Sequence, residues 1–108
     1  MSLYRFKSRE TGDLVMLQPS GKRILEILGK DPVGSGIIQP AEMPGAVEAL
    51  RAAAAAEEAN HQRMKEEAQA NGEPEPQFES VSLRMRIAPF NEMMQRCQQA
   101  GVEIVWGV

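Results

Sequence analysis

The stretch SLRMRIAPFNEMMQRCQQAGVEIVWGV, residues 82–108, decides the fold because it contains the clearest helix and the clearest strand in the chain. Pro89 predicts a kink or a break in this helix, and Gly101 predicts its end. Apolar side chains recur in the helix at steps of four and three residues, as on one buried face: Leu83, Ile87, Phe90, Met94 and Cys97. Alternate residues of the final segment then predict one face of a core strand: Val102, Ile104, Trp106 and Val108.

The N-terminal residues predict a hairpin. Tyr4 and Phe6 alternate with basic side chains, and a polar turn ending at Gly12 separates this strand from the apolar run 14–17. The unbroken apolar run indicates that the second strand is buried on both faces. We expect the C-terminal strand to lie beside the first strand, which brings Trp106 close to Tyr4 or Phe6.

Two further helices are predicted between the hairpin and the C-terminal stretch. Ser20 is a candidate N-cap for a short helix that ends at Gly29, and residues 30–39 then form a loop. The next helix, residues 44–70, is rich in alanine and glutamate and is about 40 Å long at 1.5 Å per residue. Its apolar face weakens after Ala54, so only its first half has a clear core side.

These elements predict an α+β fold in a single domain, residues 1–108, with the order β-β-α-α-α-β. The expected sheet has three strands, supplied by the hairpin and the C-terminal strand, and the three helices pack on it. An acidic segment with two prolines, residues 71–79, predicts a mobile linker between the second and third helices.

Composition and charge narrow the class of protein. The 108 residues are 43% hydrophobic and 25% charged, as in ordinary globular domains. The net charge is −3, and residues 40–79 concentrate it with nine acidic and three basic side chains. A nucleic-acid-binding protein normally carries a basic field, so nucleic acid is not an expected partner.

The remaining general features predict a cytoplasmic protein that does not cross a membrane. Cys97 is the only cysteine, which excludes an internal disulfide. Residues 1–10 lack the apolar stretch of a signal peptide, and no run approaches the roughly 18 apolar residues of a membrane helix.

No catalytic or metal site can be assembled around His61, the only histidine. Glu58 precedes it by three residues, but the Glu-x-x-His pairs of di-metal helical bundles need matching ligands on other helices. Cys97 lies in the predicted buried stripe, and nothing marks a base beside it. We therefore interpret His61 as a solvated residue beside Glu57 and Glu58, and we expect no metal, no cofactor and no catalysis.

Basic residues near the glycine-rich loop 30–38 form a candidate binding site. The loop does not follow the phosphate-binding pattern G-x-x-x-x-G-K-[ST], and Gly29 ends a helix instead of beginning one. Two interpretations stay open: the basic side chains match acidic residues within the molecule, or they bind a small molecule or anion. The residues concerned are Lys22, Lys30, Arg84 and Arg86.

Several strings along the chain resemble a family of short bacterial proteins, domain of unknown function 1840. The resemblance runs over the whole chain and implies that it ends naturally at Val108, but it implies no activity and no catalytic residue. The strings are TGDLVML at 11–17, ILGKDP at 27–32, GII at 36–38, SLRMRIAPF at 82–90 and VWGV at 105–108.

The outer half of the long helix and the acidic segment 71–79 together form the candidate partner surface. The long helix exceeds the third helix, which is about 28 Å long, so residues 55–70 are left without full cover. The leading hypothesis is a non-catalytic protein-interaction module that contacts another protein or, in an antiparallel homodimer, a second copy. Binding of a small molecule or anion at the basic residues is the alternative. The expected partner contacts are Ala55, Glu58, His61, Met64 and Ala68.

Overall fold

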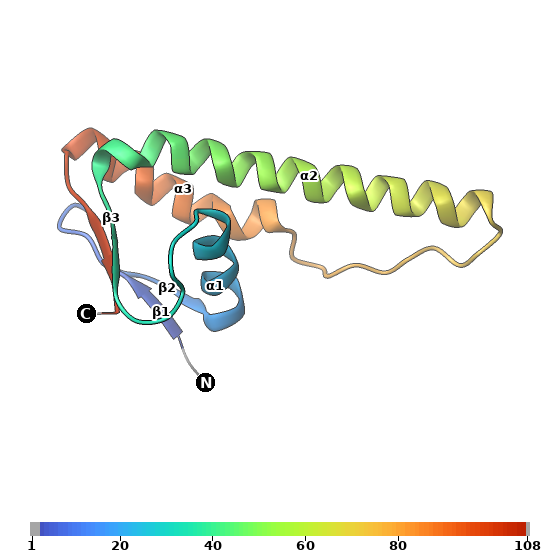
Figure 1. Ribbon diagram of the computed structural model, residues 1–108, viewed down its shortest axis with the longest axis horizontal. Coiled ribbons are helices and arrows are strands. Elements are labelled where there is room, and N and C mark those ends of the chain that lie inside the picture. The colour runs from blue at the N-terminus through green and yellow to red at the C-terminus, as the bar shows by residue number, and fades with distance from the viewer. Residues whose placement is uncertain (1–2, 108) are drawn as a thin grey trace.

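The computed structural model describes residues 3–107 and has the α+β architecture shown in Figure 1. In chain order the elements are β1 (Leu3–Phe6), β2 (Leu14–Leu17), α1 (Gln18–Ile27), β3 (Gly36–Ile38), the short 3₁₀ helix η1 (Pro40–Glu42), α2 (Met43–Ala70), α3 (Leu83–Ala100) and β4 (Ile104–Trp106). The predicted fold class and the order of the predicted elements are confirmed, with β3 as an additional strand.

The prediction of one three-stranded sheet is wrong. Within residues 3–107, β1 pairs antiparallel with β2, and β4 pairs antiparallel with β3, so the structure has two two-stranded sheets. One bridge joins them: the N–H of Lys7 donates to the carbonyl of Val105 at 2.8 Å, and the N–H of Val105 donates back at 2.9 Å. β3 lies in the predicted loop 30–39, where three residues are too few to show the alternation of a strand.

Gly36 and Trp106 explain why β4 pairs with β3. The two residues face each other in the strand register, and a Cβ atom at residue 36 would overlap the ring of Trp106. The missing side chain therefore leaves room for an indole that is 1% exposed and whose ring centroid lies 5.8 Å from that of Phe6. The expected proximity of Trp106 to Phe6 and the burial of Ile104 are confirmed, whereas Val108 lies outside the described residues.

The hairpin β1–β2 has one covered face and one open face. Gly21 of α1 lies against the ring of Tyr4, so α1 covers the same side as Tyr4. Val15 and Leu17, on the other side, are 42% and 55% exposed. The expectation that β2 is buried on both faces is therefore wrong, because α1 folds back onto one face of the hairpin only.

Glycine ends each of the three α-helices within residues 3–107. Gly29, Gly72 and Gly101 have φ angles of 73°, 67° and 69°, in the left-handed region that glycine adopts without strain. After each glycine, an N–H donates to the carbonyl five residues back at 2.8–3.0 Å, which satisfies the end of the helix. The predicted ends are thus confirmed, but α1 begins at Gln18, and Ser20 is not its cap.

The core lies between the sheets, α1, α3 and the first half of α2 (Figure 1). The five predicted core residues of α3 are all buried, and α3 continues through Pro89 without a break. In α2 the buried residues end at Ala54. We call residues 57–70 of α2 the arm, because this part extends past the N-terminal end of α3, and residues 71–81 the strap, because they return beside it (Figure 1).

Replacing Gly36 tests the packing of β3 against the indole of Trp106. We expect Gly36→Ala to lower the free energy of unfolding by about 1–3 kcal/mol, because the new methyl group overpacks the ring. Gly12→Ala is the control, since a Cβ atom there meets nothing within 4 Å. Urea unfolding measures both, and equal stability of the two variants would contradict the packing described.

Candidate functional site

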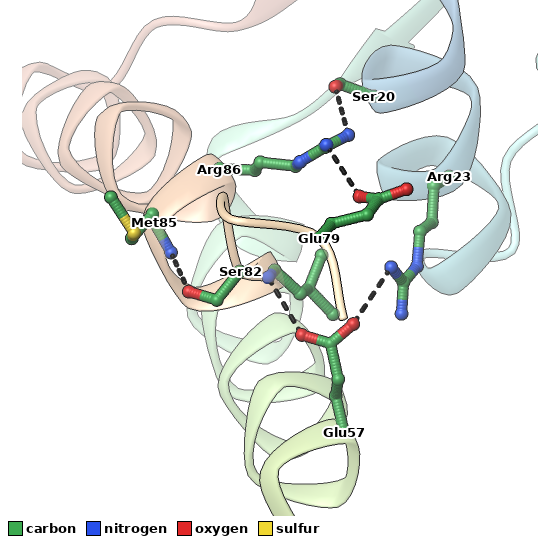
Figure 2. A network of polar contacts seen from close by, with 8 residues as sticks. Ser20, Arg23, Glu57, Glu79, Ser82, Met85 and Arg86 are labelled. Atoms are coloured by element: carbon green, nitrogen blue, oxygen red, sulfur yellow. Dashed lines mark hydrogen bonds and ion pairs between the residues drawn. The ribbon is translucent and has the colours of Figure 1, made fainter. Parts of the chain in front are cut away.

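The carboxylate of Glu57 lies where α1, α2 and the start of α3 meet (Figure 2). Its Oε1 atom accepts a hydrogen bond from Nη1 of Arg23 at 3.2 Å, and its Oε2 atom accepts one from the N–H of Leu83 at 2.9 Å. The hydroxyl of Ser82 accepts from the N–H of Met85 at 3.2 Å. Ser82 therefore caps α3 from within, and Glu57 satisfies a second N–H of the same helix end from a different helix.

Two arginines of α3 add further links at this junction. Arg84 donates from Nε and Nη2 to the two carboxylate oxygens of Glu58, both at 2.8 Å. Arg86 donates to the hydroxyl of Ser20 on α1 and to Glu79 of the strap, also at 2.8 Å each (Figure 2). The first turns of α3 are thereby tied to α1, to α2 and to the strap.

The strap lies along the side of the arm that continues the core face of α2. Phe78 stacks on His61 with ring centroids 3.8 Å apart and planes 8° from parallel. Nearer the end of the arm, Glu75 lies 3.8 Å from the ammonium group of Lys65. The segment 73–79 itself has no helix or strand. Its position depends on these side-chain contacts and on the backbone hydrogen bonds at the end of α2.

A groove of about 360 Å³ opens between the strap and helices α1 and α2. Arg23, Glu57, His61, Phe78 and Ser82 contribute to its lining. Both oxygens of Glu57 are already bonded, and the hydroxyl of Ser82 serves as the helix cap. In the part of the chain that the structure describes, no hydrogen bond joins His61 to a hydroxyl or thiol, so the groove presents no nucleophile paired with a base.

The electrostatics of the junction favour ionised carboxylates. The N–H of Leu83, and after it Arg23, holds the pKa of Glu57 below its usual range despite the opposing effect of burial. Hydrogen bonding by Arg84 lowers the pKa of Glu58, and hydrogen bonding by Lys30 lowers that of Glu42. Among residues 3–107 there is no group of three or more His, Cys, Asp or Glu side chains placed to hold a metal ion.

Three of the four basic residues of the candidate anion site pair with carboxylates within the molecule. Arg84 and Arg86 lie together at the start of α3, whereas Lys22 is exposed on α1 and Lys30 follows the end of that helix. Lys30 donates to Glu42 at 2.6 Å, so all except Lys22 have a carboxylate partner within the molecule. Binding of an anion at these residues stays a prediction.

The five expected partner contacts lie on different sides of α2. Ala55 is exposed, and Met64 is 38% exposed. Glu58 is bound by Arg84, His61 stacks on Phe78 of the strap, and Ala68 is half-buried. Sequence reasoning missed the strap as the cover of this face, although one signal was present: Phe78 is the only aromatic residue in the polar segment 71–82.

The family described as domain of unknown function 1840 matches residues 2–106, essentially the whole chain. The chain belongs to this family. No curated protein and no solved structure matches the chain. Within residues 3–107, no helix combines the length and the apolar character required to cross a membrane.

Replacing Glu57 tests the link between α2 and the start of α3. We expect Glu57→Gln to lower the free energy of unfolding by about 1–2 kcal/mol at pH 7, because a charge-assisted acceptor is lost. The folded pKa of Glu57 lies below the unfolded value of about 4.3, so its contribution is present above that pH and is lost as pH falls through the folded pKa.

The difference between wild type and Glu57→Gln should therefore shrink at about pH 3. Urea unfolding at both pH values measures it. Glu92→Gln on the exposed side of α3 is the control and should change little at either pH. A Glu57→Gln effect of the same size at both pH values would show that the charge of Glu57 is not what stabilises the junction.

Proposed function

We propose that this protein is a non-catalytic protein-interaction module of the cytoplasm and that it binds its partner through helix α2. One observation carries the proposal: α2 continues past the core as the arm, although none of its residues after Ala54 is buried. The arm, residues 57–70, is about 21 Å long at 1.5 Å per residue. Helices of globular proteins gain most of their stability by burying an apolar face, and the strap covers only part of one side of the arm.

The junction at Glu57 makes the arm suitable for recognition. Glu57 and Glu58 bond to α1 and α3 at the point where α2 leaves the core, so the direction of the arm is fixed relative to the folded domain. A rigid helix loses little conformational entropy when a partner binds. The strap supports the same arrangement because it returns from the tip of the arm to the junction (Figure 1).

The alternative function, binding of a small molecule or anion at the basic residues, has less support. Arg84 is held by a bidentate ion pair, and Lys30 by one at 2.6 Å. An incoming anion would compete with these carboxylates. Lys22 is exposed on α1 and offers a single charge at the surface.

Photo-crosslinking in cells tests the interaction through the arm. A photoreactive amino acid replaces Ala59 or Met64 in the arm, or Gln99 on the exposed side of α3 as the control. We expect crosslinked adducts from the two arm positions and much less from residue 99. An equal yield from all three positions, or none from the arm, would count against the proposal.

A further inference from the structure

Helix α2 has a second face, opposite to the core and the strap, that stays exposed along most of its length. We call this the back face. Figure 1 shows α2 along one side of the molecule, with α3, α1 and the strap on its other side. The residues of the back face are all exposed: Gly45, Glu48, Ala52, Ala55, Ala56, Ala59, Arg63 and Glu66.

We infer that the back face binds a second copy of this chain, in an antiparallel helix pair whose two-fold axis passes between Ala55 and Ala56. The inference rests on the proposed function and names its partner. Antiparallel pairing about a two-fold axis makes every contact occur twice, so the face must be complementary to itself. In this register Ala52 faces Ala59 of the second copy, and Glu48 faces Arg63 of the second copy.

The charges of the back face fit this register. Within residues 3–107 Arg63 has no carboxylate partner, and its guanidinium group bonds only to the side-chain oxygen of Asn60 on the same helix. Glu48 is 78% exposed and lies 3.7 Å from Arg51, a weak pair that leaves the carboxylate accessible. Antiparallel pairing brings these opposite charges together at both ends of the contact, which is the charge complementarity that selects a second copy.

The ends of the contact favour the same register. Glu66 faces Gly45 of the second copy, in the first turn of its α2. The N-terminal end of a helix attracts negative charge, and the carboxylate of the N-cap residue Glu42 is already engaged by Lys30 and by the N–H of Gln39. Sliding the two copies so that Glu48 faces Glu66 or Glu67 would place like charges opposite each other. Between the charges, only alanine side chains separate the two helices, so the backbones can approach closely.

Charge reversal in the purified protein tests the inference. Sedimentation equilibrium over the micromolar range should show wild type in monomer–dimer exchange. Arg63→Glu and Glu48→Arg should each raise the dimer dissociation constant about tenfold, because two attractive pairs become repulsive. Mixing these two variants should restore wild-type association, since both pairs are again of opposite charge. Arg96→Glu, an exposed residue of α3, is the control with the same change of charge.

The two α2 variants must stay folded for their association to be compared with that of wild type. At concentrations well below the wild-type dimer dissociation constant, both α2 variants should melt like wild type, since the substituted side chains are exposed and glutamate and arginine are good helix formers. A wild type that stays monomeric throughout overturns the inference; arm adducts with a different protein would then leave the proposed function standing. A dimer that Arg63→Glu does not weaken more than Arg96→Glu overturns the back face as the contact. Weakening without recovery on mixing overturns the antiparallel register.

Discussion

The carboxylate of Glu57 is the constraint on which the helical part of this structure depends. Glu57 lies just after the last buried residues of α2. Its carboxylate accepts a hydrogen bond from the first N–H of α3, 26 residues later in the chain. This bond acts together with the Ser82 cap to hold the start of α3, and Arg23 fixes the same carboxylate to α1. Because the start of α3 is held there, the strap, residues 71–81, must run back along the arm from its tip to the junction. The extended path of the strap follows from these two fixed ends.

The local features of the sequence predicted the helices well and the strand partners poorly. The buried stripe of α3 and the glycines after each helix are local patterns, and both describe the structure correctly. The partner of β4 depends on Gly36, whose contribution is the absence of a side chain beneath Trp106. A pattern of hydrophobic residues contains no signal for such a space. The single bridge between Lys7 and Val105 is what remains of the expected pairing between the first and last strands.

At the candidate site, the sequence predicted the kinds of side chain but not their partners. The start of α3 is basic and α2 is acidic. One of the two interpretations of the sequence was that these charges pair within the molecule, and Arg84 and Glu58 do so. Which arginine meets which glutamate cannot be predicted from composition, because partners 26 residues apart are chosen by helix packing. The same holds for Phe78 and His61, whose stacking depends on the path of the strap. The residue types predicted which segments are charged and which are apolar. Which face of α2 contacts α3, which contacts the strap and which stays exposed depends on tertiary packing.

The pairing of β4 with β3 also has a consequence for the order of events during synthesis. A ribosome delivers the chain from its N-terminus, and Phe6 and Ile38 emerge long before the indole that closes the core over them. Until residue 106 has left the exit tunnel, β3 has no strand partner among the described residues, and the bridge at Lys7 cannot form. The helices can therefore form before the core closes. Contacts between residues so distant in sequence are also slow to form, which makes this closing step a candidate for the rate-limiting event of folding.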